Sequence, residues 1–193
     1  MKNYKVKVND RRLLRAVLSS FGFEDKDLDS VCITFDKMDK IGLEGVTEEL
    51  NEKGFSDTAV NNFKVFLSKQ DFSLTSIRDM LDDKESADSL IHIIDSVNEI
   101  TGNAYDVVFD LSLVRGQGYY TGTVFEVESI DFKGAIAGGG RYDNLIGKFL
   151  NENVPAVGFS IGFERIFSIL MEHGISIPDR EKKVAVMYDS ENL

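Results

Sequence analysis

The spacing of hydrophobic residues divides the chain into a helical first part and a strand-rich second part. Polar and apolar side chains alternate over residues 4–8, which predicts a strand close to the start. A helix is predicted over residues 11–18, with Asn9 or Asp10 suited to cap its first turn. Over residues 24–84, apolar side chains recur every three or four positions, as on one face of a helix. This spacing predicts a small subdomain of short helices.

Glycines mark the expected helix ends. Gly42 and Gly45 are expected to break the first long helix of this block, and Gly54 to end the next one. A stronger helix is predicted over residues 87–100, because its apolar stripe is continuous and Gly102 follows it.

Beyond residue 103 the pattern changes to strands joined by short connections. Short connections favour an antiparallel sheet, because parallel strands need longer crossovers. Helices are expected over residues 141–150 and from about Gly162 onward. The predicted fold class is therefore α+β, an antiparallel sheet flanked by helices. The expected strands are residues 107–114, 123–128, 135–137 and 155–161.

Composition and charge narrow the possible functions. Hydrophobic residues make up 42% of the chain and charged residues 28%, as in ordinary globular proteins. The formal net charge of -11 argues against a simple grip on nucleic acid, which needs a basic face. With Cys32 as the only cysteine and only His92 and His173, we expect neither an intrachain disulfide nor a zinc site. No apolar run is long enough to span a bilayer, and we expect a soluble cytoplasmic protein.

Three clusters pair glycine with arginine, at residues 115–122, 138–143 and 158–165. Glycine lets a ligand approach the backbone closely, and arginine offers a fork of donors that matches a carboxylate or a phosphate. The glycine spacing fits neither the Rossmann fingerprint nor the Walker loop. The clusters favour a site for a small anionic ligand. The alternative is three tight turns with arginines in solvent.

The same clusters resemble motifs of the histidyl-tRNA synthetases. Residues 113–126, LVRGQGYYTGTVFE, resemble the first histidine-specific motif, and residues 137–143, AGGGRYD, resemble the second. Residues 155–165, PAVGFSIGFER, are similar to motif 3 of class II synthetases, and residues 35–42 to the insertion region of this family. The resemblance runs over nearly the whole chain in the family's order.

This resemblance implies a class II synthetase-type antiparallel sheet with a helical insertion subdomain. The family forms histidyl-adenylate from histidine and ATP, with Mg2+ screening the phosphates and no tightly bound cofactor. It then transfers histidine to tRNA(His), acting as a homodimer. The chain is thus expected to be a fragment of an enzyme, a histidine–tRNA ligase.

The motif match also implies roles for particular residues. Arg115 would be the catalytic arginine, where a fixed cation stabilises the charge that grows on the α-phosphorus. Arg115 would also bind ATP, together with Gly162 and Arg165. No protein ligand to a metal is expected. The histidine pocket would be formed by Tyr119, Tyr120, Gly138, Gly139, Gly140, Tyr142 and Gly158.

The chain departs from the family pattern in two places. The common form has Leu-Asp where this chain has Gln117-Gly118, so a carboxylate expected near the tyrosines is absent. Motifs 1 and 2 have no counterpart and would precede Met1, so we expect that the chain does not form adenylate alone. The expected domains are a core strand (1–9), the helical insertion (10–84), the C-terminal half of the catalytic core (85–178), and a linker with the first strand of a truncated anticodon-binding domain (179–193).

Two other functions stay open. One is a non-catalytic relative, the regulatory subunit of ATP phosphoribosyltransferase, which also resembles these synthetases. The pattern of Gly162, Glu164 and Arg165 in motif 3 favours the synthetase, because that relative usually loses it. The other is an interaction or folding module without a ligand.

Overall fold

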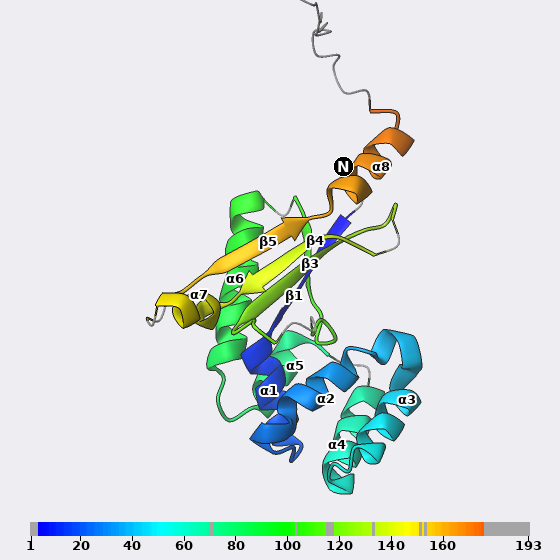
Figure 1. Cartoon of the computed structure of the whole chain (residues 1–193), viewed down its shortest axis with the longest axis vertical. Helices are drawn as coiled ribbons and strands as arrows, with labels where there is room; N and C mark the ends of the chain where they lie inside the picture. Colours follow the sequence, from blue (N-terminus) through cyan, green and yellow to red (C-terminus); the bar gives the residue numbers. More distant parts are fainter. Residues whose placement is uncertain are drawn as a thin grey trace, which may run out of the picture.

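Strands and helices are arranged as a single sheet with helices at one end and along one face (Figure 1). The computed structural model describes residues 4–69, 72–102, 104–114, 118–132, 134–150, 152 and 154–175. Its fold is α+β, as predicted. The linker and strand expected over residues 179–193 lie outside the described residues.

The sheet has five strands in the order β2-β1-β3-β4-β5. Three of its four pairings are antiparallel, as expected, but β1 and β2 run parallel. The sequence prediction missed this pairing, because the whole helical block lies between the two strands and provides the long crossover that parallel strands need. The strands are β1 (Tyr4–Asp10), β2 (Asp106–Phe109), β3 (Thr123–Ser129), β4 (Ala135–Arg141) and β5 (Val157–Ile161).

Helices occupy the predicted block between β1 and β2, and two more follow in the second part. The Asp10 side chain caps α1 by accepting a hydrogen bond from the Arg12 amide, as predicted. Helix α6 ends at Gly102, whose φ of 58° is left-handed. The helices are α1 (Arg11–Ser20), α2 (Leu28–Phe35), α3 (Met38–Glu52), α4 (Asp57–Ser68), α5 (Leu74–Met80), α6 (Glu85–Thr101), α7 (Asp143–Leu150) and α8 (Phe163–Glu172), with a 3-10 turn at Asp25–Asp27.

Some predicted boundaries were wrong. Gly42 kinks α3 with a φ of 70°, but Gly45 lies inside the helix and does not break it. Strand β2 ends at Phe109 because Asp110 turns the chain by accepting hydrogen bonds from the amide and hydroxyl of Ser112. Strand β4 continues through the triple glycine to Arg141, so α7 begins two residues later than expected.

The main hydrophobic core lies between the helices and the sheet, where α1 and α6 pack against β1. Leu13, Leu14, Val17 and Leu18 of α1 are fully buried there. The core continues without a break from α2–α5 into this layer. A second, small cluster joins Leu113, Tyr120 and Val124, with Tyr142 packed against it.

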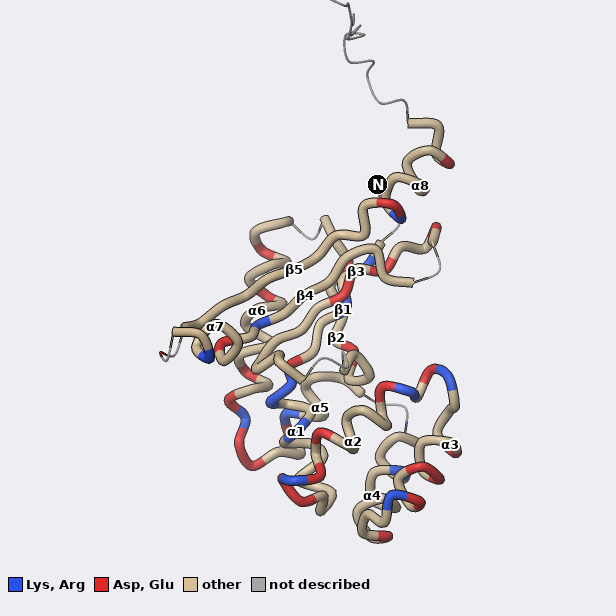
Figure 2. Tube along the Cα trace, viewed as in Figure 1, with Lys and Arg blue, Asp and Glu red and all other residues tan. Residues whose placement is uncertain are grey.

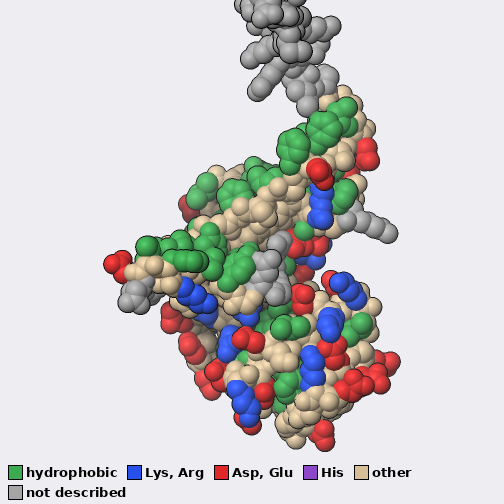
Figure 3. All heavy atoms as spheres, viewed as in Figure 1, with side chains coloured by type: hydrophobic (Ala, Val, Ile, Leu, Met, Phe, Trp, Pro, Cys, Tyr) green, Lys and Arg blue, Asp and Glu red, His purple; other side chains and the backbone are tan. Residues whose placement is uncertain are grey.

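Charge and apolar surface are divided between the two ends of the molecule. Asp, Glu, Lys and Arg are frequent along α1–α4, whereas β5 has none (Figure 2). A band of apolar side chains runs over α7, β5 and α8 (Figure 3), and it includes the exposed Phe149, Phe159 and Phe163. Among the described residues, no helix is both long and apolar enough to cross a membrane.

Candidate functional site

Tyrosines and glycines from three segments surround a hollow of about 310 Å3 on the sheet. The segments are the turn before β3, the end of β4 with the start of α7, and β5. Five of the residues expected to bind histidine line it together. The lining residues are Tyr119, Tyr120, Gly138, Tyr142, Leu145, Gly158, Phe159 and Ser160.

The three tyrosines form one wall of this pocket. The rings of Tyr119 and Tyr120 lie 4.5 Å apart between centroids, and their hydroxyl oxygens are 3.3 Å apart. The ring of Tyr142 is 6.0 Å from Tyr119 and 6.5 Å from Tyr120. On a strand, two successive tyrosines would point to opposite faces. They lie in a turn instead, so that both rings reach the pocket.

Glycine keeps the opposite wall open. A Cβ on Gly140 would lie 2.8 Å from both the Tyr120 ring and the Thr123 carbonyl oxygen. A Cβ on Gly158 would lie 3.1 Å from the Tyr142 ring. Gly139 lets the β4 and β5 backbones approach, because its Cβ would lie 2.7 Å from the Phe159 Cα. Any side chain at these positions would displace a tyrosine ring or a strand.

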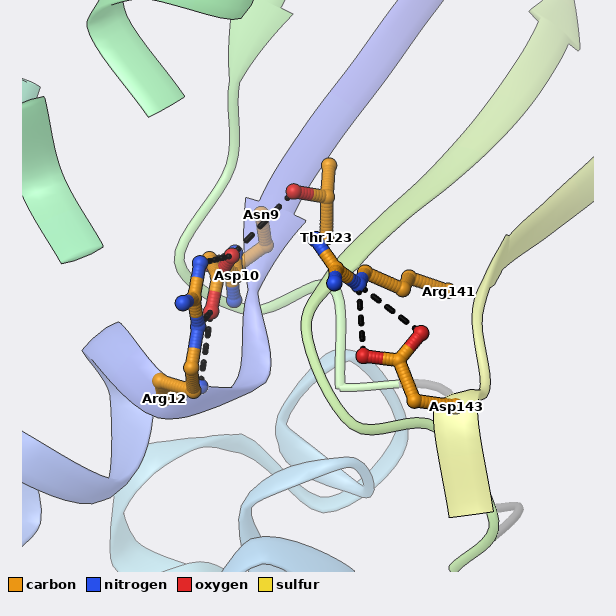
Figure 4. A network of polar contacts seen from close by, with 6 residues as sticks. All are labelled: Asn9, Asp10, Arg12, Thr123, Arg141 and Asp143. Carbon is orange, nitrogen blue, oxygen red and sulfur yellow. Dashed lines mark hydrogen bonds and ion pairs between the residues drawn. The ribbon is translucent and has the colours of Figure 1, made fainter. Parts of the chain in front are cut away.

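A buried polar network holds the chain on either side of residues 115–117 (Figure 4). The Asn9 side-chain amide donates to the carbonyls of Leu111 at 3.0 Å and Leu113 at 3.1 Å. The neighbouring Asp10 carboxylate accepts a hydrogen bond of 3.1 Å from the Thr123 hydroxyl. Both side chains are almost completely buried. Sequence reasoning considered them only as helix caps, although two polar residues at the end of an apolar strand can signal such a network.

Arg12 completes the network from α1. Its guanidinium donates to both Asp10 oxygens, at 3.1 and 3.0 Å, and this carboxylate raises the pKa of Arg12. The arginine is therefore permanently charged, and it compensates the buried carboxylate that anchors Thr123.

Of the residues expected to bind ATP, Gly162 and Arg165 are not among those that line the pocket. Arg165 donates from Nη1 to the Ala135 carbonyl, and its guanidinium carbon lies 5.6 Å from the centroid of the Phe132 ring. Gly162 directly precedes α8. Arg115 lies outside the described residues, so its position relative to Arg165 is not part of this site's geometry.

The pocket lining has no charged residue among the parts of the chain that the structure describes. Aromatic faces and two adjacent hydroxyls suit a small ring that carries hydrogen-bonding nitrogens. No group of three or more His, Cys, Asp or Glu side chains within the described ranges could hold a metal ion.

Comparison with known proteins gives consistent matches. A family model described as histidyl-tRNA synthetase matches residues 1–166. The chain is 37% identical to a histidine–tRNA ligase of Leifsonia xyli, covering 98% of this chain and 45% of that protein. It is 36% identical to the cytoplasmic histidine–tRNA ligase of Arabidopsis thaliana, covering 94% of this chain and 21% of that protein. The chain therefore spans less than half the length of these relatives.

Solved structures agree with the sequence matches. The crystal structure of histidyl-tRNA synthetase from Nostoc sp. is similar with a TM-score of 0.76 and 29% identity, over 91% of this chain and 43% of that one. A protein of Bacillus halodurans described as an ATP phosphoribosyltransferase regulatory subunit/histidyl-tRNA synthetase matches with a TM-score of 0.65 and 23% identity, over 88% of this chain and 44% of that one. At 23% identity, the similarity to the Bacillus halodurans protein shows a shared fold alone.

Proposed function

Because the chain belongs to the histidyl-tRNA synthetase family, we propose that it supplies the histidine-binding part of a histidine–tRNA ligase. The observation that carries this proposal is the pocket in which Tyr119, Tyr120 and Tyr142 meet the glycines of β4 and β5. Histidine has a flat ring with two nitrogens. The paired hydroxyls would bond a ring nitrogen, and the aromatic faces would contact the ring.

The glycines would serve this pocket in two ways. Gly138 and Gly158 line it directly, and Gly158 also leaves room for the Tyr142 side chain. Gly139 and Gly140 stand beside it and leave room for β5 and the Tyr120 ring. Together they would make the floor on which the imidazole lies.

In the complete ligase, the histidine carboxylate oxygen would attack the α-phosphorus of ATP. The bond between the α-phosphorus and the oxygen that links it to the β-phosphorus would break, and pyrophosphate would leave with its Mg2+. We assign Arg115 to the α-phosphate by its motif, as a fixed cation at the growing charge. Gly162 and Arg165 would hold the nucleotide. Transfer to tRNA(His), a homodimeric assembly and a cytoplasmic location are proposed for that ligase as a whole.

Histidine binding by the 193-residue chain tests this function directly. We expect calorimetry to show histidine binding, and Tyr119→Phe to weaken it up to about tenfold, since a hydrogen bond contributes about 0.5–1.5 kcal/mol. The matched control is Tyr105→Phe, because Tyr105 pairs with Tyr4 away from the pocket. Absence of binding, or equal effects of the two variants, would refute the proposal.

We expect no histidine-dependent pyrophosphate exchange by this chain alone, since groups assigned to motifs 1 and 2 are needed in one geometry.

The second candidate is the regulatory subunit of ATP phosphoribosyltransferase. Its support is the fold shared with the Bacillus halodurans protein. Activation of a purified ATP phosphoribosyltransferase catalytic subunit by this chain would favour that function over the ligase.

A further inference from the structure

Asp143 lies just outside the pocket, at the first residue of α7. The single N–H of the Arg141 Nε is shared by both oxygens of the Asp143 carboxylate, at 2.9 and 2.7 Å (Figure 4). The same carboxylate accepts the backbone amide of Ala156 at 3.1 Å, and the Asp143 amide donates to the Thr121 hydroxyl at 3.0 Å. One residue thus joins the Thr121 segment and the Ala156 segment to the end of β4, where Arg141 lies.

Each of these segments leads directly into a wall of the pocket. Thr121 follows the Tyr119–Tyr120 pair, and Arg141 precedes Tyr142. Ala156 lies two residues before Gly158 of β5. The distance between the tyrosine wall and the β5 wall therefore depends on the bonds that meet at Asp143.

Backbone hydrogen bonds tie the same segments, and the β4–β5 ladder ends beside them with Arg141 opposite Val157. The Thr121 amide donates to the Arg141 carbonyl, and the Tyr142 amide to the Ala156 carbonyl, each at 2.8 Å. The Asp143 side chain is 19% exposed and its bond to Ala156 is partly buried, whereas the Arg141 side chain is 49% exposed. Hydrogen bonds to an ionised group are also roughly twice as strong as neutral ones. The carboxylate contacts both Arg141 and the Ala156 amide.

We propose that Asp143 is a positioning residue for the pocket. It does not contact the ligand. Its carboxylate holds the Tyr142 segment against β5, and its amide holds the Tyr119–Tyr120 segment through Thr121. The pocket is thereby preorganised before the ligand arrives. That the ligand is histidine rests on the proposed function, whereas the positioning itself does not.

The side-chain test uses Asp143→Ala and Asp143→Asn. We expect Asp143→Ala to weaken histidine binding tenfold or more, because a displaced wall loses its aligned contacts. Asp143→Asn keeps one oxygen for the Ala156 amide but loses the charge that faces Arg141, so its loss should be smaller. The matched control is Asp88→Ala, which removes a comparable ion pair to Arg78 that does not border the pocket. Equal binding by all four proteins, wild type included, would overturn the proposal.

A second readout needs no ligand. The chain has six tyrosines, which 3-fluorotyrosine labelling and 19F NMR report separately. In Asp143→Ala, the resonances of Tyr119, Tyr120 and Tyr142 should shift or broaden. The resonances of Tyr4 and Tyr105, whose rings contact each other, should keep their wild-type positions, since this pair lies at the β2 edge of the sheet and the pocket at the β5 edge.

The two readouts separate the possible failures. If wild type binds no histidine but the three pocket resonances respond, the histidine assignment is wrong and the positioning role holds. If wild type binds histidine and neither Asp143 variant changes binding or resonances, the positioning role is wrong. A shift of all tyrosine resonances in both Asp143→Ala and Asp143→Asn would show a general structural role and would also overturn the proposal.

Discussion

Gly140→Ala should both destabilise the protein and disturb the pocket. The added methyl would lie 2.8 Å from the Thr123 carbonyl oxygen and 2.8 Å from the Tyr120 ring. Neither neighbour can move easily. Thr123 belongs to β3 and pairs with Asp10 of β1, and Tyr120 is buried against Leu113 and Val124. Overpacking of this kind costs about 1–3 kcal/mol.

The effect can be measured by urea unfolding followed by circular dichroism. With a slope of about 1–3 kcal/mol per molar urea, the expected loss moves the midpoint down by roughly 1 M. Gly118→Ala is the matched control in the neighbouring turn, because nothing lies within 4 Å of a Cβ built there. Neither glycine has a left-handed φ, so backbone strain does not enter the comparison.

The control should change stability by no more than about 0.5 kcal/mol, as surface substitutions usually do. Equal midpoints for Gly140→Ala and Gly118→Ala would show that β4 has room at residue 140. The explanation of the triple glycine by close approach would then be wrong. The same pair should differ in histidine affinity, since only the methyl at residue 140 contacts a pocket tyrosine.

Three further predictions concern residues outside the pocket lining. Asn9→Ala should lower the free energy of unfolding in urea by about 1–3 kcal/mol, because the buried carbonyls of Leu111 and Leu113 lose the side-chain amide that donates to them. A decrease below about 0.5 kcal/mol, the size of a neutral surface substitution, would contradict this. Burial would raise the pKa of Asp110, but hydrogen bonds from Ser112 and Lys7 lower it below its ordinary 3.8. The carboxylate therefore stabilises the fold above pH 3.8, and the stability difference between wild type and Asp110→Asn should shrink as pH falls through the lowered pKa; a constant difference would argue against it. Burial raises the pKa of the Cys32 thiol to about 11. Iodoacetamide should therefore modify Cys32 at pH 8 far more slowly in the folded protein than in the urea-unfolded chain. Equal rates in the two states would disprove the burial of Cys32.

The elements could be predicted from the sequence where neighbouring residues decide them. The stripe along α6 and the cap at Asp10 are local features, and both were predicted correctly. The parallel pairing of β1 with β2 joins residues about a hundred positions apart, such as Val6 and Val107. The alternation of polar and apolar residues predicts that β1 is a strand and needs neighbouring strands. The pattern does not indicate that β2 pairs on one side and β3 on the other.

The candidate site shows the same limit in its glycines. A glycine run indicates that something comes close to the backbone, but not what comes close. Gly138 lines the pocket, whereas at Gly139 and Gly140 the close neighbours are the protein's own β5 backbone and Tyr120 ring. The arginine beside them, Arg141, is half-exposed and pairs with Asp143. The glycines and the arginine of residues 138–143 therefore first let the pocket walls approach each other, and only the resulting hollow can then select a ligand.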